Sequence, residues 1–404
     1  AWDRRTGKPL TNAVVWQCGR AQALCRAIAE PDAAYVRQTT GLPLSPYFSA
    51  AKMAWLLRRC PAVQEAAQRG TLCLGTVDTW LLFCLTEGRT FATDVSNASR
   101  TQLMDLLHTR WDPQLLALFG IPPEALPEIR CSDDLFGTTT LGGLFPQDVP
   151  IRAVMGDSHA ALYGAGCGRE GMAKATYGTG SSVMLFTGRQ PVVSRHGLAA
   201  TVAWGRNGQT YYGLEGNINY AGAVIEWLIH RAGLLTSADE AEALALQAAP
   251  ADRTVFVPAF TGLGAPHWAP EMRAAIVGMG STTGRAEIVR AAVDSIAYQV
   301  TDVLRAMAED VGQPAAQLFC DGGAVRNSYL MQRQSELLRS VIRVAENQDG
   351  SCAGAAKMAG EAAGLYGGDT VFGAWQREYR PQQSAAWAEA EYGRWQSAVK
   401  QIKG

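Results

Sequence analysis

The sequence has no excess of charge of either sign and no long apolar run. Its 36 lysines and arginines against 37 aspartates and glutamates leave a formal net charge of -1. This balance gives no electrostatic reason to expect nucleic acid or an anionic membrane as a partner. No apolar segment reaches the roughly 20 residues of a membrane-spanning helix, and no signal-peptide pattern is present. We therefore expect a soluble, cytoplasmic protein that binds a small molecule or another protein. A homodimer is one of the assemblies that the sequence allows.

The sequence also lacks paired cysteines. Nine cysteines lie between Cys18 and Cys352, and none forms a CxxC motif. An odd number without pairing is typical of reduced cytosolic thiols, and it argues against a disulfide framework or a structural zinc site. An initiator methionine is absent as well. Residues 1–20 begin with a short apolar stretch, continue with a polar turn at residues 6–9 and end with a second apolar run, which resembles a β-hairpin whose first strand is cut short. We interpret this start as typical of a fragment.

At 404 residues the chain is too long for one ordinary core, so two domains are expected. Apolar periodicity and turn residues predict an alternation of strands and helices, which is typical of an α/β fold. Predicted helices cover residues 17–30, 51–69, 75–86, 158–166, 221–230, 284–310 and 327–338, and predicted strands cover 89–94, 151–156, 172–177, 181–188, 200–206, 209–216, 255–259 and 317–321. We place the domain boundary between 165 and 171, giving domains 1–167 and 168–404 with a cleft near Asp157.

Three glycine-rich segments are candidate binding loops. In TYGTGSS, residues 176–182, Gly178 and Gly180 suggest unusual backbone angles, and Thr179 adds a donor to what is either a phosphate cradle or a tight hairpin turn. CDGGAVRN, residues 320–327, joins a strand to a helix and suits either a nucleotide or an ordinary turn. The third, FVPAFTGLGAPHW at residues 256–268, is either a binding loop or a structural crossover.

Asp157 lies in AVMGDSHAALYGAG, where a predicted strand meets a helix. One interpretation is an N-cap for a helix that begins at Ser158 or His159. A metal ligand beside His159 is a second, but no third histidine or cysteine has a matching spacing. The third is a general base at the mouth of a cleft, which is compatible with capping.

Taken in order, nine segments resemble the FGGY carbohydrate kinases, and among them the glycerol kinase branch. They are NAVVWQC (12–18), GLPLSPYFSAAKMAWL (41–56), GTVDTWLL (75–82), TDVSNASRT (93–101), GDSHAALYG (156–164), GMAKATYGTG (171–180), VPAFTGLGAPHW (257–268), SIAYQVTDVL (295–304) and DGGAVRNSYLMQ (321–332). The resemblance covers essentially the whole chain.

The resemblance implies two ribonuclease-H-like domains of the actin and hexokinase type, with ATP and a polyol or sugar meeting in the cleft between them. It implies Asp157 as the base that takes the proton from the acceptor hydroxyl, and Mg²⁺ bound with ATP. By the same resemblance, residues of the nucleotide and acceptor sites are assigned as follows: Gly178, Thr179 and Gly180 contact the phosphates, Gly222, Gly323 and Asn327 bind the nucleotide, and Trp16 and Tyr47 line the acceptor pocket.

Three departures from the family pattern matter. Ser158 stands where the glycerol kinase branch has glutamine, and Ser182 where it has an aromatic ring, which implies a wider, more polar pocket. The loop TTTLGGLFPQ, residues 138–147, has no basic residue, so we expect no sugar-bisphosphate regulation. The family's phosphate loop and acceptor-binding Arg-Glu pair do not occur in this chain, so the first domain is expected to be incomplete at its N-terminus.

We therefore expect ATP-dependent phosphorylation of a polyol or sugar hydroxyl, similar to that of the glycerol kinase branch. The alternatives are a kinase for a larger polyol or a ketopentose such as xylulose or ribulose, and a non-catalytic nucleotide-binding remnant if the natural chain begins at Ala1. An actin-like ATPase switch would not need a pocket containing Trp16, Tyr47 and Asp157.

Overall fold

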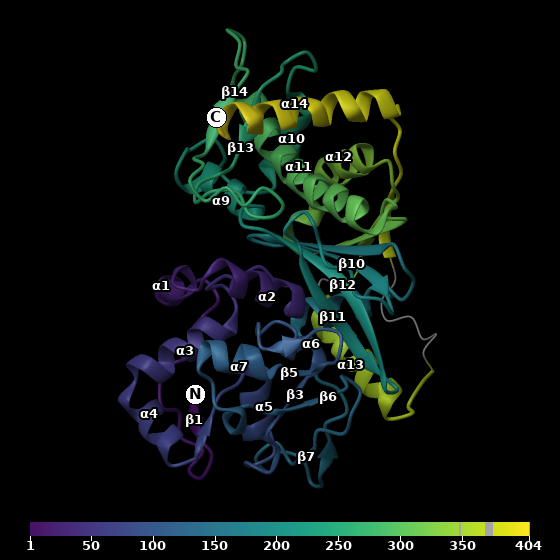
Figure 1. Ribbon diagram of the computed structural model, residues 1–404. Helices are drawn as coiled ribbons and strands as arrows, with labels where there is room; N and C mark the ends of the chain where they lie inside the picture. The colour runs from purple at the N-terminus through teal and green to yellow at the C-terminus, as the bar shows by residue number, and fades with distance from the viewer. Residues whose placement is uncertain (347–348, 368–374, 404) are drawn as a thin grey trace.

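The chain forms two bodies joined by a long sheet and two packed helices (Figure 1). The computed structural model describes residues 1–346, 349–367 and 375–403. Helices α1 to α5 lie in one body, and helices α9 to α12 and α14 lie in the other. Among the described residues, no helix combines the length and the apolar character needed to cross a membrane.

The first body is mainly helical, and its strands are short. Its elements are β1 (Trp2–Asp3), η1 (Gly19–Ala21), α1 (Gln22–Arg26), α2 (Glu30–Thr40), α3 (Ser49–Arg59), α4 (Pro61–Gln68), β2 (Leu72–Cys73), α5 (Val77–Leu85), β3 (Ala92–Asp94), α6 (Val95–Ala98), β4 (Met104–Asp105), β5 (Arg110–Trp111), α7 (Pro113–Phe119), η2 (Pro123–Ala125), β6 (Glu128–Arg130), β7 (Thr138–Thr139), β8 (Val149–Pro150) and α8 (Asp157–Gly164). The strands pair as β1-β2, β3-β6, β4-β5 and β7-β8.

The second body is built around a seven-stranded sheet in the order β11-β12-β10-β9-β15-β16-β17. Its elements are β9 (Met172–Tyr177), β10 (Ser181–Gly188), β11 (Ala199–Arg206), β12 (Gln209–Ile218), α9 (Gly222–His230), α10 (Glu240–Gln247), β13 (Val255–Val257), β14 (Ala275–Val277), α11 (Arg285–Val311), β15 (Gln317–Asp321), η3 (Gly323–Arg326), α12 (Ser328–Leu338), β16 (Ile342–Ala345), α13 (Gly350–Ala362), β17 (Trp375–Tyr379) and α14 (Ala385–Lys403). Strands β9, β10 and β12 are antiparallel, and β15 and β16 continue parallel to β9.

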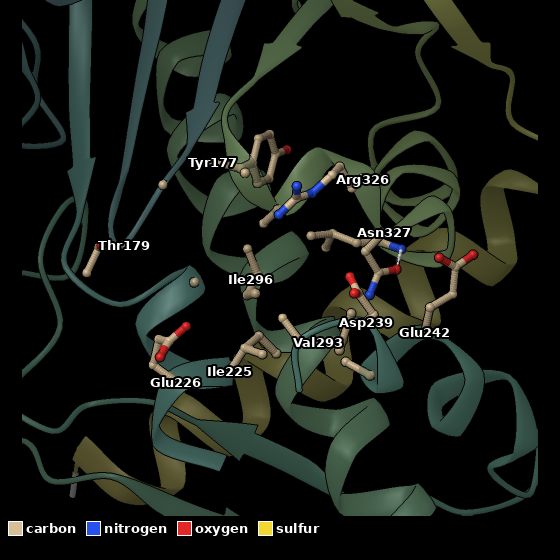
Figure 2. A pocket seen from close by; sticks show the side chains of 17 residues that line it. Tyr177, Thr179, Ile225, Glu226, Asp239, Glu242, Val293, Ile296, Arg326 and Asn327 are labelled. Carbon is tan, nitrogen blue, oxygen red and sulfur yellow. Dashed lines mark hydrogen bonds between the residues drawn. The ribbon is translucent and has the colours of Figure 1, made fainter. Parts of the chain in front are cut away.

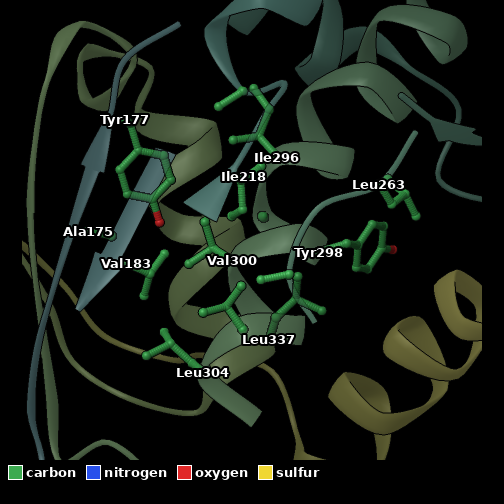
Figure 3. Packing of buried hydrophobic residues seen from close by; sticks show 14 of the residues in the cluster. Ala175, Tyr177, Val183, Ile218, Leu263, Ile296, Tyr298, Val300, Leu304 and Leu337 are labelled. Atoms are coloured by element: carbon green, nitrogen blue, oxygen red, sulfur yellow. The ribbon is translucent and has the colours of Figure 1, made fainter. Parts of the chain in front are cut away.

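This sheet is covered by helices on both faces, which explains its apolar strands. Side chains alternate along β10, so Val183 and Leu185 belong to the core around α11, whereas Met184 and Phe186 pack with α8 and α13. Figure 3 shows residues of α11, including Ile296, Val300 and Leu304, in the core with Tyr177 and Val183 of the sheet. Burying each side chain of this size contributes about 1.5–3 kcal/mol. The sheet is therefore a rigid base for the loops at its edge.

Several predicted elements are confirmed, including the hairpin of β9 and β10, the Asn207-Gly208 turn, and helices α5, α9, α11 and α12. At the turn, Asn207 and Gly208 have φ of 51° and 70°, the left-handed values that such a two-residue connection requires. The predicted helix 51–69 is instead two helices, because Pro61 cannot continue the backbone hydrogen bonding of α3. Within the predicted helix 17–30, Gly19–Ala21 forms a 3-10 helix, Gln22–Arg26 is α-helical, and Glu30 begins α2.

Two strand predictions near functional segments were wrong. Residues 151–156 form no ladder; single hydrogen bonds hold them, from Ile151 N to Gly137 O and from Val154 N to Ser132 O. The hairpin predicted within residues 1–20 is met only by an isolated bridge between Trp2 and Pro9, and β1 pairs instead with β2. The apolar composition of these segments suggested strands, but strand pairing depends on partners distant in sequence.

Candidate active site

The second body contains a pocket of about 390 Å³ between the β9-β10 turn, α9, α10, α11 and η3 (Figure 2). One part of its lining is apolar and includes Ile225, Val293 and Ile296. The polar part includes Thr179, Glu226, Asp239, Glu242, Arg326 and Asn327. An apolar wall with a few polar groups is typical of a pocket for a planar, hydrogen-bonding ligand. We call it the second-domain pocket.

Five of the six residues predicted to bind nucleotide line this pocket. They are Gly178, Thr179, Gly222, Gly323 and Asn327. Gly180 is not among the lining residues; its carbonyl accepts a hydrogen bond from Gly178 N at 3.0 Å. The structure thus places Gly180 in the turn that shapes the pocket.

The reason for glycine at the β9-β10 turn differs from the prediction. Gly178 and Gly180 do not have positive φ, so unusual backbone angles are not what they supply. Glycine is needed here because the backbone packs closely against its neighbours. A Cβ on Gly180 would lie 2.5 Å from the carbonyl oxygen of Ile218. A Cβ on Gly222 would lie 2.7 Å from the carbonyl oxygen of Gly178. The first turn of α9 is therefore fixed directly against the predicted phosphate loop.

On the opposite side of the pocket, the β15-α12 connection is shaped by Gly322. This residue has φ 95°, and a Cβ there would lie 2.6 Å from Tyr177 O. Asn327 begins α12, and its side-chain oxygen accepts a hydrogen bond from Leu330 N at 2.9 Å. This capping bond fixes the orientation of the Asn327 side chain, which also lines the pocket.

Asp157 is the first residue of α8, and Gly156, not Asp157, occupies the N-cap position. The interpretation of Asp157 as an N-cap was therefore wrong by one residue. Its carboxylate is exposed and accepts a hydrogen bond from Ser158 N at 2.7 Å. The positive end of a helix stabilises a carboxylate at this position. Asp157 thus combines a fixed backbone with an accessible carboxylate.

Helix α8 is attached to the nucleotide side through α13. Ser351 Oγ donates to the backbone oxygen of Asp157 at 2.9 Å. At the preceding residue, a Cβ on Gly350 would lie 2.6 Å from Oδ2 of Asp321, which ends β15 just before the pocket loop. Asp321 is itself paired with Lys174 of β9 at 2.9 Å. The Ser351 contact with Asp157 is exposed, whereas Asp321 and Lys174 are buried, and together these contacts link the start of α8 to the end of β15.

The predicted acceptor residues Trp16 and Tyr47 contact each other, with ring centroids 5.4 Å apart. Both loops are held by Lys52, whose ammonium donates to the carbonyls of Trp16, at 3.4 Å, of Tyr47, at 2.7 Å, and of Pro46. Lys52 is buried, and burial lowers its pKa. The sequence analysis did not identify Lys52, although it lies within a segment that carried the family resemblance.

Ser182 is linked to two charged residues that the sequence analysis also missed. Its hydroxyl donates to Glu215 Oε1 at 2.9 Å, and Arg100 Nη2 lies 2.5 Å from Glu215 Oε2. Burial raises the pKa of the Tyr47 hydroxyl, and the charges of Glu215 and Asp157 raise it further. Tyr47 therefore lies within electrostatic range of both Asp157 and Glu215, and Glu215 also binds the Ser182 hydroxyl.

His159, which one interpretation of the sequence placed with Asp157 as a metal ligand, is buried on α8. Its Nε2 lies 2.9 Å from Thr201 Oγ1. Burial, helped by the nearby Arg100 charge, lowers its pKa to about 3, so the ring is neutral at ordinary pH. In this position His159 supports α8 against β11.

Comparison with known proteins agrees with this geometry. The model for the N-terminal domain of the FGGY family of carbohydrate kinases matches residues 1–164, and that for the C-terminal domain matches residues 173–363. A glycerol kinase from Alkalilimnicola ehrlichii is 45% identical over 404 residues, which span all of this chain and 81% of that protein. One from Desulfitobacterium hafniense is 42% identical, over 99% of this chain and 82% of that protein.

The crystal structure of Plasmodium falciparum glycerol kinase with ADP superposes with a TM-score of 0.92 at 33% identity, covering 99% of this chain and 81% of that one. A gluconate kinase from Lactobacillus acidophilus, 20% identical, shares the fold with a TM-score of 0.86 over 98% of this chain and 81% of that one. The two-domain fold expected from the sequence, of the actin and hexokinase type, is confirmed. The chain belongs to the FGGY family of carbohydrate kinases.

Proposed function

We propose that the protein transfers the γ-phosphoryl group of ATP to a hydroxyl of a small polyol, with glycerol as the first candidate. Relatives 42–45% identical over the whole chain are glycerol kinases, and the 33% identical solved structure contains ADP. The observation that carries the proposal is the position of Asp157. Its exposed carboxylate begins α8, which Ser351 ties to α13 beside the second-domain pocket.

We assign the second-domain pocket to the nucleotide. Its fit rests on the apolar wall, which suits a nucleobase, and on the Gly178–Gly180 turn, against which the first turn of α9 packs closely because Gly222 has no Cβ. Thr179 would contact the phosphates, and Gly323 and Asn327 the nucleoside. Arg326 adds a positive charge to the same rim.

We assign Asp157 as the general base. Its carboxylate takes the proton of the acceptor hydroxyl as that oxygen forms a bond to the γ-phosphorus and the bond to the ADP oxygen breaks. Trp16 and Tyr47 would cover the acceptor carbons, and Ser158 and Ser182 would complete the pocket. Such catalysis depends mainly on alignment, which the α8-α13 contact supplies.

Mg²⁺ is part of the proposal because the reaction concentrates negative charge on the phosphates. Among the described residues, no group of three or more His, Cys, Asp or Glu side chains could hold a metal ion alone. This agrees with the usual state of Mg²⁺, which binds substrate phosphates and water with one or two carboxylates. Its contribution would be to neutralise charge on the transferred group.

A second candidate is a kinase for a longer polyol or a ketopentose. Ser158 and Ser182 are short polar residues at positions where the resemblance predicted bulk. In the structure the Ser182 hydroxyl donates a hydrogen bond to Glu215. The serine therefore adds a charged carboxylate to the surroundings of the acceptor pocket as well as extra room. This observation favours a polar acceptor without fixing its length.

Two further assignments accompany the function. We propose that the domains divide at residues 167 and 168, which the ranges of the two family models support. We also propose a cytoplasmic location, because all nine cysteines are free thiols.

A panel of acceptors tests the proposal. Glycerol, erythritol, ribitol, xylitol, xylulose and ribulose are compared by ADP release with ATP and Mg²⁺. We expect turnover of at least one acceptor, with glycerol among the substrates. A higher kcat/KM for a four- or five-carbon acceptor would favour the second candidate. No turnover of any acceptor by the folded protein would contradict the proposed reaction and favour a nucleotide-binding remnant.

A further inference from the structure

Arg100 and Glu215 form a buried ion pair between the two domains. Arg100 follows α6 in the first domain, and Glu215 lies on β12 in the second. Nη2 and Oε2 lie 2.5 Å apart, and the side chains are 18% and 6% exposed. A buried pair of this kind adds little net stability, because desolvation of the two charges offsets their attraction. Stability alone therefore does not explain why it is here.

The pair has unused hydrogen-bonding capacity. In the part of the chain that the structure describes, Arg100 Nη1 is buried without a hydrogen-bond partner, and Glu215 Oε2 accepts no hydrogen bond of regular geometry. Buried polar atoms are nearly always satisfied, so such an exception calls for a ligand or another specific cause. Here one unpaired donor and one acceptor belong to neighbouring side chains.

The surroundings place this pair beside the proposed acceptor site. The Arg100 guanidinium carbon lies 5.2 Å from the centre of the Phe48 ring, and Phe48 packs against Tyr47 at 5.0 Å. Tyr47 contacts Trp16, and Ser182 holds the other oxygen of Glu215. The aromatic cover and the ion pair are therefore adjacent parts of one site.

We propose that Arg100 and Glu215 determine acceptor specificity by binding the terminal hydroxyl at the end of the acceptor opposite the one that is phosphorylated. A hydroxyl can donate to Glu215 and accept from Arg100 Nη1 at the same time, which matches this pair. Because the pair is neutral overall, it selects a neutral polyol and gives no attraction to an anionic acceptor. Ser182 is a positioning residue that fixes the Glu215 carboxylate. This inference rests on the proposed function.

The experiment compares glycerol with 1,2-propanediol, which lacks one terminal hydroxyl. The measured quantity is the ratio of the two kcat/KM values within each variant, so differences in the fraction of folded protein cancel. The wild type is expected to prefer glycerol strongly, because a site built for a hydroxyl rejects an analogue without it. Glu215→Gln keeps the shape but removes the charge, and it should reduce this preference about tenfold. Ser182→Ala should reduce it about threefold.

Glu391→Gln is the matched control. Glu391 is also a buried carboxylate, paired with Arg333 at 2.5 Å and near the Tyr298 hydroxyl, but it lies on α14. It should lower stability without changing the ratio. An unchanged ratio in Glu215→Gln, with activity present, would overturn this inference and leave the proposed function standing. Equal loss of preference in Glu391→Gln would also overturn it. Absence of turnover in the wild type would overturn both.

Discussion

Gly354 lies where the helix of the proposed base meets α13, and its replacement should impair catalysis more than nucleotide binding. A Cβ at this position would lie 1.7 Å from the carbonyl oxygen of Ala160 in α8. Since a normal contact needs more than 3.0 Å, Gly354→Ala requires α8 and α13 to separate by roughly 1.5 Å, because the packed core cannot absorb the overlap. Overpacking of this size costs about 1–3 kcal/mol in stability.

Displacing the helix also displaces Asp157, which begins it. A misplacement of about 1 Å is enough to lower the rate of a positioned reaction roughly 100-fold. We therefore expect Gly354→Ala to reduce kcat about 100-fold and to change ADP affinity, measured by calorimetry, much less. Ser351→Ala removes only the hydrogen bond to Asp157 O and should reduce kcat about fivefold.

Gly393→Ala provides the control, because Gly393 is also helical but a Cβ there meets nothing within 4 Å. It should keep full activity and slightly raise stability, since alanine is the better helix former. The reasoning would be refuted if Gly354→Ala, folded by circular dichroism, kept a kcat within about twofold of the wild type. It would also be refuted if ADP affinity fell as much as kcat.

Two further predictions concern the pocket and the residue behind the base. Gly222→Ala should weaken ADP binding about tenfold in calorimetry, because the new Cβ would lie 2.7 Å from Gly178 O, whereas Gly168→Ala, with open space around it, should bind normally. Burial lowers the pKa of His159 to about 3 from an ordinary 6.5. Between these pH values the unfolded chain binds a proton on this ring that the folded chain does not bind. The stability that the neutral ring contributes is therefore complete above pH 6.5 and is lost as the pH falls. Relative to His159→Gln, the wild type should lose about 1.4 kcal/mol of unfolding free energy per pH unit between about pH 6 and 4.5, and parallel urea-unfolding results for the two proteins would contradict this.

The sequence was sufficient for those features that local pattern determines. An apolar run beside a glycine-rich turn predicted β10, the Asn-Gly pair predicted the β11-β12 turn, and the glycine segments at residues 176–182 and 320–327 contain seven of the 17 pocket-lining residues. Family resemblance, and not pattern, supplied the role of Asp157. Local pattern failed at residues 151–156, which are extended but pair at isolated points with a distant loop.

Contacts between residues far apart in the chain could not be predicted from single segments. From its sequence context Lys52 is expected to be a surface lysine of an amphipathic helix. In the structure its ammonium is buried and donates hydrogen bonds to three loop carbonyls. Arg100 and Glu215 are 115 positions apart in the sequence, and nothing in either segment indicates that they meet.

The central claim is that Asp157 is the base of a phosphoryl transfer, and Asp157→Asn tests it most directly. The amide keeps the shape of the side chain and an oxygen for Ser158 N, but it cannot accept the proton. In the ADP-release assay, we expect kcat with the preferred acceptor to fall about 1,000-fold, with the fold and ADP affinity unchanged. Asp148→Asn, an exposed change in the first domain, should have no effect. Retention of most of the activity by Asp157→Asn would contradict the account.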